Sequence, residues 1–515
     1  MVRGEGSRPK AEARGGARRA FWWAGLGAVA ALATAALIAL GLPEISSHPV
    51  TAPAATVPVS PPEQVGDADA PSASGAQVAR DTKSARVPPP AGKLAAFYDA
   101  LFKVERAGAR APVTILHLGD SHIASDRITG EVRRLLQARF GDAGRGLMMP
   151  GFPFPYYKAP GFSFEKTGNW TAANSLTQDG TYGITGVSLT GSGADATLKL
   201  VSTTGRPFTA PEVLLLAAQG GGHAVISAGG KSEEVATGAD AHAVLRVSLP
   251  VSTAALEIEV KGDGPVTVLG VAAGSGRRGV RYVNLGIPSA SALTTRRFDR
   301  ALAKSDIEEL APKLVVLGYG TNEGFIDTLD LGAYEKEYVR LIELVKAAAP
   351  NAPLVILGPL DGTRLPVFVK GDARGAAPCR PLDAKDEADY GALLAKEDPS
   401  LARWHEPPKL EAVRALLARL ADRYHATYFD LAAVMGGPCS IDRWAKAVPP
   451  LALPDHVHLS DEGSRRVGQA LYDALIKDYD RYRAQSAESG SDGSEAPAPE
   501  QVAGPVAAQP HMGAP

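Results

Sequence analysis

Two kinds of hydrophobic pattern alternate along residues 93 to 485 of this chain. Short apolar runs that end in turns alternate with segments in which apolar residues recur every three or four positions. Continuous apolar strands separated by amphipathic helices are typical of a parallel sheet covered on both faces, so the pattern predicts an α/β domain. The expected strands are Val113 to Leu118, Arg281 to Leu285, Leu314 to Leu317, Leu354 to Leu357 and Thr427 to Leu431. Helical patterns follow the first strand (Ile128, Val132, Leu136) and occupy 291 to 304, 333 to 348, 409 to 423 and 461 to 483.

The pattern changes between residues 152 and 280, where the helical period disappears. Short segments of alternating apolar and polar residues take over, separated by Gly-rich turns: ATLKLVST, EVLLLAA, HAVISA, AVLRVSL and ALEIEVKG. This texture is typical of an antiparallel sandwich. We therefore expect one α/β domain, in parts 93–151 and 281–485, interrupted by an inserted β-sandwich at 152–280.

The N-terminal 92 residues contain three compositional segments. A basic segment, 1–19, precedes the apolar run 20–42, in which Thr34 is the only polar side chain. A run of this length spans a bilayer core, and its basic flank favours the cytoplasm, so we expect a single-pass signal anchor with the rest of the chain periplasmic or extracellular. A cleaved signal peptide is the alternative, although its apolar region is usually shorter.

Two further segments have compositions that do not support a packed core. Residues 43–92 are rich in proline and lack Phe, Trp and Tyr, and residues 486–515 are rich in Ser, Gly, Glu, Pro and Ala. Such segments bury too little apolar surface to offset the entropy lost on ordering. We expect a disordered linker at 43–92 and a disordered tail at 486–515.

Composition narrows the possible function classes. The chain has 515 residues, 45% of them apolar, and its 54 basic and 56 acidic residues give a net charge of -2. Disorder throughout the chain is excluded, and the balance argues against a nucleic-acid partner. The only cysteines, Cys379 and Cys439, are too few for a disulfide scaffold or a Cys-rich zinc site.

Polar residues gather where the expected strands end. Gly119-Asp120-Ser121-His122 follows the first strand, Asn284-Leu285-Gly286 closes the second, and Gly320-Thr321-Asn322-Glu323 follows the third; Asp455-His456-Val457-His458 precedes the last helix. Functional groups of open parallel sheets lie at the carboxyl ends of the strands. Each group of residues is weak evidence alone, but four groups in order point to one site.

These residue types suit nucleophilic attack on an ester. A serine hydroxyl becomes a nucleophile when a histidine accepts its proton, and a carboxylate orients that histidine. We expect Ser121, His458 and Asp455 in these roles. The oxyanion that forms needs preorganised donors, for which the Ser121 amide, the Gly286 amide and the Asn322 side chain are candidates.

The same residues resemble the motifs of the SGNH hydrolases, also called GDSL-like esterases. The four blocks of that family are matched by Gly119-Asp120-Ser121, Gly286, Gly320-Thr321-Asn322 and Asp455-His456-Val457-His458. The resemblance implies a flavodoxin-like, three-layer α/β/α sandwich, a Ser121/His458/Asp455 triad and an oxyanion hole of Ser121, Gly286 and Asn322, with Asp120, His122 and Gly320 supporting the pocket. His122 replaces the leucine of the GDSL form, and Glu323 replaces an Asp.

A β-rich insert behind a membrane anchor is similar to the arrangement in certain peptidoglycan O-acetylesterases, whose insert resembles a carbohydrate-binding module. Seven aromatic residues at the start of the insert agree with sugar binding, although a packed junction between domains is the alternative. They are Phe152, Phe154, Tyr156, Tyr157, Phe162, Phe164 and Trp170. The resemblance implies an acylated polysaccharide as substrate, peptidoglycan above all, and neither metal nor organic cofactor.

Three other functions agree with part of the sequence. Gly-Asp-x-His also opens a metallophosphoesterase pattern in which Asp120, His122, His456 and His458 bind metal, but the further blocks of that pattern are missing. A glycan-binding protein without catalysis is disfavoured by the intact Ser, His and Asp. A polysaccharide O-acetyltransferase with the same triad stays open, because water access to the acyl-enzyme decides between transfer and hydrolysis.

One long connection, residues 359 to 408, is too long and polar for a simple turn, and we expect a lid or substrate loop there. Cys379 lies within it, and a bridge to Cys439 would tie it to another loop, with two unpaired buried cysteines as the alternative. His117, inside the first strand, is expected in the core. The prediction is thus a membrane-anchored, extracytoplasmic esterase that removes small acyl groups, most simply acetyl, from a polysaccharide.

Overall fold

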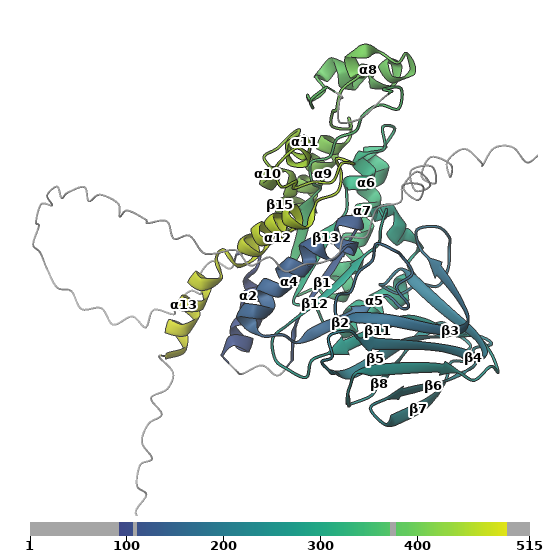
Figure 1. Ribbon diagram of the computed structural model, residues 1–515. Helices are drawn as coiled ribbons and strands as arrows, with labels where there is room; N and C mark the ends of the chain where they lie inside the picture. The colour runs from purple at the N-terminus through teal and green to yellow at the C-terminus, as the bar shows by residue number, and fades with distance from the viewer. Residues whose placement is uncertain (1–91, 107–110, 371–376, 492–515) are drawn as a thin grey trace, which may run out of the picture. The chain divides into compact units, whose positions relative to one another are not determined.

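The computed structural model describes residues 92–106, 111–370 and 377–491 (Figure 1). The predicted basic segment, anchor and nearly all of the predicted linker lie outside these residues, as does the tail beyond 491. Among the described residues, no helix combines the length and the apolar composition that crossing a bilayer requires. The predicted anchor at 20–42 therefore stays a prediction.

A five-stranded parallel sheet forms the centre of the α/β part. Its strands are β1 (Val113–Gly119), β12 (Val280–Gly286), β13 (Leu314–Gly318), β14 (Leu354–Gly358) and β15 (Thr427–Asp430). They pair in the order β12-β1-β13-β14-β15, and every neighbouring pair is parallel. Numbered within this sheet alone, that order is 2-1-3-4-5, which is the flavodoxin-like order. All five strands fall where the apolar runs predicted them.

Helices cover both faces of this sheet because side chains of each strand alternate between the faces. Val113 and Ile115 of β1 join the core that contains α2, α4, α10, α11 and α12, whereas Leu116 and Leu118 join the core that contains α5, α7 and α9. Figure 1 shows α4 and α12 side by side on one face, where they contact each other. The predicted three-layer arrangement is therefore present in the described residues.

The helices flank the strands at these positions. On the first face and in its connections they are α2 (Ala95–Glu105), α3 (Ser121–Ala124), α4 (Arg127–Phe140), α10 (Leu431–Met435), α11 (Ser440–Ala445), α12 (Asp461–Ile476) and α13 (Tyr479–Ser491). The others are η1 (Ala292–Arg297), α5 (Arg300–Leu310), α6 (Thr321–Gly324), α7 (Leu331–Ala348), α8 (Ala384–Ala395), η3 (Pro399–Leu401) and α9 (Leu410–Arg423).

Two predicted helices are each divided in the structure. The segment 291 to 304 splits into η1 and α5 because the Asp299 side chain accepts hydrogen bonds from the amides of Ala301 and Leu302 and so starts a new helix. The segment 461 to 483 splits into α12, which ends at Ile476, and α13. Since α13 continues to Ser491, residues 486–491 of the predicted disordered tail are helical.

The region between β1 and β12 forms a ten-stranded antiparallel sheet. Its strands are β2 (Gly144–Met148), β3 (Phe162–Asn174), β4 (Val187–Ser202), β5 (Phe208–Ala217), β6 (His223–Ala228), β7 (Lys231–Ala236), β8 (Ala243–Ser248), β9 (Ser252–Thr253), β10 (Ala255–Val260) and β11 (Val266–Gly274). The first half of β4 pairs with β11 and its second half with β10, while β3 pairs along both. Hydrogen bonds therefore join all ten strands into one branched sheet, and a sandwich of two separate sheets stays a prediction.

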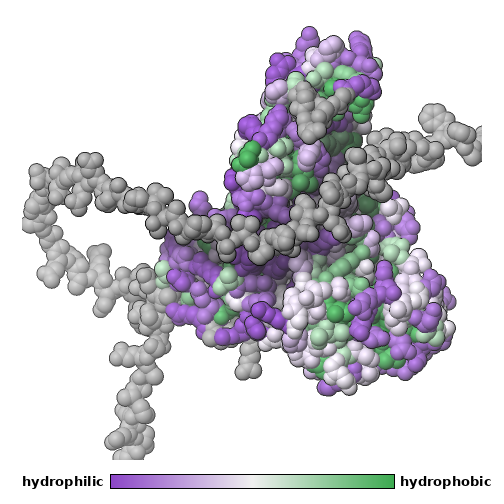
Figure 2. All heavy atoms as spheres, viewed as in Figure 1, coloured by the Kyte–Doolittle hydropathy of each residue, from purple (hydrophilic) through white to green (hydrophobic). Residues whose placement is uncertain are grey.

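This sheet is not independent of the α/β part. β2, which precedes the predicted boundary at 152, pairs with β11, and the core of the ten-stranded sheet is continuous with the α5, α7 and α9 side of the parallel sheet. Six of the seven aromatic residues at the junction are buried or pack against that core, and only Tyr156 is largely exposed, at 57%. The packed junction thus accounts for six of them. On the face seen in Figure 2, hydrophilic and hydrophobic residues are interspersed over this sheet.

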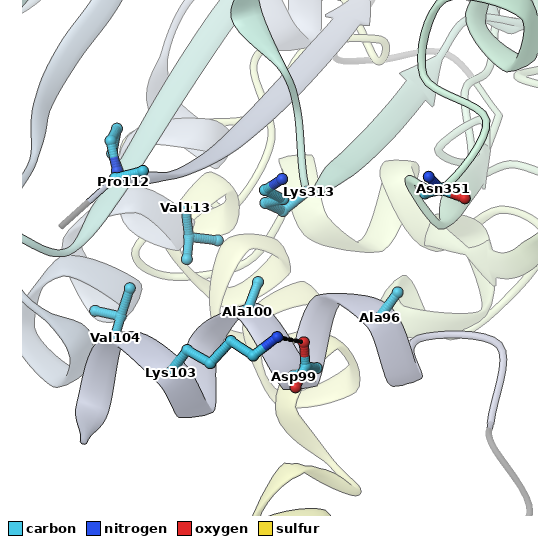
Figure 3. Close-up of a pocket in the computed structure, with 10 residues that line it drawn as sticks. Ala96, Asp99, Ala100, Lys103, Val104, Pro112, Val113, Lys313 and Asn351 are labelled. Carbon is cyan, nitrogen blue, oxygen red and sulfur yellow. Dashed lines mark ion pairs between the residues drawn. The ribbon is translucent and has the colours of Figure 1, made fainter. Parts of the chain in front are cut away.

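A pocket of about 260 Å³ lies at the amino ends of the parallel strands (Figure 3). Its walls come from α2 and from the residues that precede or begin β1, β13 and β14: Ala96, Asp99, Ala100, Lys103, Val104, Ala111, Pro112, Val113, Lys313 and Asn351. None of the residues predicted for the site lines it. The predicted chemistry therefore has to be sought at the opposite edge of the sheet.

Candidate active site

Ser121 is the first residue of α3, directly after β1. The preceding Asp120 caps this short helix, because its side chain accepts the amide of His122 at 3.0 Å. As the first helical residue, Ser121 has an N–H without an intrahelical acceptor. The turn thus presents both a hydroxyl and a backbone donor at the carboxyl edge of the sheet.

Ser121, His458 and Asp455 form a continuous chain of hydrogen bonds. Ser121 Oγ lies 3.0 Å from His458 Nε2, and His458 Nδ1 lies 2.7 Å from Asp455 Oδ2. The structure therefore brings together the three residues that the sequence singled out, 337 positions apart between the serine and the histidine. A carboxylate on Nδ1 favours the imidazole tautomer whose Nε2 can accept the serine proton.

The loop that carries Asp455 and His458 is organised by Asp455 itself. Its Oδ1 accepts the amides of Val457 at 3.0 Å and His458 at 2.9 Å, while its Oδ2 faces the His458 ring. Partial burial acts to raise the pKa of Asp455, but the His458 ring and the two amides outweigh it and lower the pKa to about 2. The carboxylate is therefore ionised at neutral pH and holds the histidine from two sides.

Asn322 approaches from α6, after β13. Its Nδ2 donates to Ala290 O at 2.7 Å, which fixes the side-chain amide and leaves its second N–H for another acceptor. The N-cap of α6 is Gly320, whose φ of 134° suits glycine alone, and a Cβ there would lie 3.1 Å from Val413. The turn that delivers Asn322 therefore depends on Gly320.

Gly286 differs from its predicted role. Its amide donates to Asn284 Oδ1 at 3.0 Å, so in this structure the N–H already has a partner. A Cβ at this position would lie 2.3 Å from Ala124 N, which explains the glycine: the backbone of α3 passes directly over the end of β12. Gly286 thus allows α3 to pack, whereas donation to an oxyanion would require the bond to Asn284 to break.

Two buried residues support the site and were not predicted to do so. Asn284 donates through Nδ2 to Ile123 O at 2.7 Å and to Asp126 Oδ1 at 2.9 Å, which ties β12 to the helix that begins with Ser121. Glu323 accepts the amide of Ala292 at 2.7 Å and so ties α6 to the loop after β12. Burial raises the pKa of Glu323 to about 7. In the sequence, both residues look like ordinary neighbours of a motif.

The remaining histidines have partners that exclude the phosphoesterase interpretation of these residues. His122 lies between Asp120 Oδ1 and Val457 O, and His456 shares a hydrogen bond with Thr363 and stacks on Trp404 at 3.7 Å. Among the described residues, no group of three or more His, Cys, Asp or Glu side chains is arranged to hold a metal ion. His117 is fully buried and bonded to Tyr282, as expected for a core residue, and burial lowers its pKa to about 3.

The long connection after β14 folds back onto the same edge. Described parts of 359 to 408 contain α8 and η3, and a disulfide joins Cys379 to Cys439 with a Cα–Cα distance of 5.5 Å. The predicted bridge is therefore present. Trp404 contacts the loop of Asp455 and His458 through its stacking on His456. Whether this connection acts as a lid stays a prediction.

Comparison with known proteins agrees with this architecture. Residues 265–466 match the GDSL-like Lipase/Acylhydrolase family. A solved peptidoglycan O-acetylesterase is 20% identical over 75% of this chain and 96% of its own, with a TM-score of 0.60. Two further solved structures are more distant. An acetyl xylan esterase is 16% identical over 39% of this chain and 83% of its own, with a TM-score of 0.25. A family two carbohydrate esterase from Cellvibrio japonicus is 11% identical over 62% of this chain and 98% of its own, with a TM-score of 0.21. No curated protein matched the chain.

The family match covers Gly286, Asn322, Asp455 and His458 and begins after Ser121, and the fold match covers 75% of this chain. The flavodoxin-like strand order and the polar residues at its carboxyl edge agree with both. Residues 265–466 of this chain therefore form a GDSL-like lipase/acylhydrolase domain, and the chain is an ester-hydrolysing enzyme.

Proposed function

We propose that this enzyme removes O-acetyl groups from a cell-wall or other extracytoplasmic polysaccharide through a serine-bound acyl intermediate. The observation that carries the proposal is the hydrogen-bonded chain from Ser121 Oγ through His458 to Asp455, with distances of 3.0 and 2.7 Å. This order of hydroxyl, imidazole and carboxylate is the one that activates a serine.

The reaction that we propose has two halves. Ser121 Oγ attacks the acetyl carbonyl carbon while its proton moves to His458 Nε2, and the tetrahedral oxyanion then collapses. The sugar hydroxyl leaves with the proton from His458, and the acetyl group stays on Ser121. Water attacks this ester with His458 as base, acetate is released, and the serine is restored.

The oxyanion donors in this proposal are the Ser121 amide and the free N–H of Asn322. Each such donor contributes about 3 to 4 kcal/mol to stabilising the tetrahedral state. We leave the Gly286 amide out because it already donates to Asn284.

Two observations support a polymeric substrate. The His458 and Asp455 side chains are 42% and 47% exposed, so the catalytic groups lie at an open edge rather than at the end of a deep pocket. The solved structure with a TM-score of 0.60 is that of a peptidoglycan O-acetylesterase. Peptidoglycan is therefore the first substrate to test. Location outside the cytoplasm, with residues 20–42 as anchor, is proposed from the sequence alone.

The test uses the full-length chain and its Ser121→Ala variant. With p-nitrophenyl acetate we expect turnover that is unchanged by a chelator and lost in the variant, whose circular dichroism should match that of the parent protein. Acetate release from O-acetylated peptidoglycan should exceed release from acetylated xylan. Turnover by Ser121→Ala would exclude this nucleophile, and a preference for xylan would redirect the substrate assignment.

A further inference from the structure

His122 occupies a buried position between the two catalytic segments. It is the second residue of α3, only 7% of it is exposed, and its two ring nitrogens point to different parts of the chain. Nδ1 lies 3.2 Å from Asp120 Oδ1, and Nε2 lies 3.0 Å from Val457 O. The ring therefore bridges the turn of Ser121 and the loop of His458.

Both contacts require the histidine to donate. A backbone carbonyl can only accept, so Nε2 must carry a proton to bond Val457 O. Asp120 Oδ1 already accepts the backbone amide of His122 at 3.0 Å, which makes it an acceptor for Nδ1 as well. A histidine that donates from both nitrogens is an imidazolium ion, and it stands beside the Asp120 carboxylate.

The His122 ring links the two segments that carry Ser121 and His458, and the distance between these two side chains matters for the reaction. Val457 is the residue before His458, and the rings of His122 and His458 lie 5.2 Å apart between centroids. The hydrogen bond from His122, in the turn of Ser121, to Val457 O therefore constrains the position of the His458 ring relative to the Ser121 hydroxyl. Displacements of about 1 Å in such geometry can cost 100-fold in rate.

We propose that His122 is a positioning residue: a buried imidazolium that ties the nucleophile turn to the loop of the general base and places a fixed positive charge beside His458. This inference rests on the proposed function, because it assumes that Ser121 and His458 react together. It assigns His122 a charge and two partners, whereas leucine at this position can supply neither.

The electrostatic surroundings agree with the geometry. Burial acts to lower the pKa of His122, but the charge of Asp120, its hydrogen bond, the Val457 carbonyl and the charge of Asp455 together raise the pKa. The titratable groups that face the ring are Asp120 from its own turn and Asp455 and His458 from the opposite loop. The two carboxylates thus favour the protonated form of the His122 ring.

The fixed charge has a consequence for the pH dependence of the reaction. A positive charge on His122, whose ring centroid lies 5.2 Å from that of His458, repels a second positive charge on the His458 ring. Without this charge, the acid limb of the kcat/KM profile should move to higher pH. A residue that only filled space would change the rate without moving that limb.

The test compares His122→Leu, His122→Gln and a matched control, His223→Leu. His223 forms an exposed pair with Asp263 at 2.5 Å in the ten-stranded sheet, far along the chain from the catalytic segments. With p-nitrophenyl acetate, His122→Leu should lower kcat about 10- to 100-fold and move the acid limb upward by about one pH unit. His122→Gln keeps one hydrogen-bond donor, so its kcat should lie between those of His122→Leu and the parent protein. Its acid limb should be shifted as in His122→Leu. His223→Leu should change neither.

Nitrogen-15 NMR of histidine-labelled parent protein gives a readout that does not depend on a variant folding. We expect one ring, assigned by its loss in His122→Gln, to carry protons on both nitrogens at pH 7. A neutral His122 ring, or a His122→Leu enzyme with unchanged kcat and profile, would overturn the inference. These results are distinct from failure of the proposed function, which would appear as turnover by Ser121→Ala.

Discussion

The two edges of the parallel sheet differ in what they offer to a ligand. The amino edge has a partly open pocket of about 260 Å³ beside α2. Its one described ion pair, Lys103 with Asp99 at 2.6 Å, joins partly exposed side chains one helical turn apart. At the carboxyl edge the proposed catalytic groups His458 and Asp455 are partly exposed. There a serine, two histidines and two carboxylates from distant segments are connected by hydrogen bonds.

This difference shows that the volume of a pocket and the chemistry of its walls are separate properties. The pocket at the amino edge has walls of α2 and strand-start residues (Figure 3), and nothing on those walls activates a nucleophile. At the carboxyl edge, loops from successive strands converge because all parallel strands end there. The site that we propose is therefore located by strand direction rather than by cavity size. Matched substitutions at the two edges can test that conclusion.

The largest difference should come from replacing one aspartate at each edge. Asp455→Asn should lower kcat by about 10³- to 10⁴-fold, because an amide facing His458 Nδ1 favours the tautomer that cannot accept the Ser121 proton. Asp99→Asn, at the amino edge, should leave kcat unchanged. The measurement is kcat on p-nitrophenyl acetate for both variants. Equal losses would mean that the carboxyl edge has no special role.

Asp455 should also make the stability of the fold depend on pH. Its pKa in the folded chain, about 2, lies below the unfolded value of about 3.9. The carboxylate therefore stabilises the fold above about pH 4, and this contribution is lost as the pH falls through about 2. The stability difference between the parent protein and Asp455→Asn should shrink in that window.

The second largest effect concerns the disulfide, which crosslinks loops at the carboxyl edge only. Cys379 and Cys439 are 60 positions apart, and closing a loop of that size stabilises a fold by about 4 kcal/mol on the chain-entropy model. Cys379→Ser/Cys439→Ser should lower the free energy of unfolding in guanidinium by about that amount. Dithiothreitol should destabilise the parent protein equally and leave the double variant unchanged. A shift below about 1 kcal/mol would contradict this estimate.

The sequence predicted the parallel sheet more fully than the antiparallel one. Strands buried on both faces, such as β13 with LVVLG, are visible as apolar runs. By contrast, β7 reads KSEEVA and is almost wholly exposed, so no alternation marks it. β2 was missed because its partner, β11, lies more than 100 residues away, and pairing at that distance leaves no local signal. Strand order in the parallel sheet came from the family resemblance alone.

For the site, the sequence located the reacting groups but not the bonds that hold them. Ser121, Asp455 and His458 stand in motifs at predicted strand or helix ends, and the structure brings them into contact. The Gly286 amide was expected to be free because a motif does not reveal that the Asn284 side chain turns back to accept it. His122 was predicted to support the pocket, but its link to the His458 loop was not predicted. Its role depends on Val457, 335 positions further along the chain.

The next effect in size comes from one asparagine at each edge. Asn322→Ala removes a proposed oxyanion donor and should lower kcat about 100- to 1000-fold with little change in KM. Asn351→Ala removes an exposed asparagine side chain from the wall of the amino-edge pocket, and it should leave kcat and KM unchanged. The pair is measured on the same ester at the same pH. If both variants lose activity, the pocket communicates with the reaction, and the separation of the two edges fails.

The smallest expected effect concerns the ion pair of the amino-edge pocket. Lys103→Ala breaks an exposed i,i+4 pair on α2, whose Lys and Asp side chains are 63% and 43% exposed. Such pairs contribute about 0.2 to 0.5 kcal/mol to a helix and weaken with salt. We therefore expect a change in the free energy of unfolding below about 0.5 kcal/mol that vanishes in high salt, with kcat and KM unchanged. Urea denaturation at low and high salt, alongside the ester assay, measures both. A loss of activity in a stably folded Lys103→Ala protein would show that the amino edge takes part in catalysis. It would contradict the assignment of the reaction to the carboxyl edge alone.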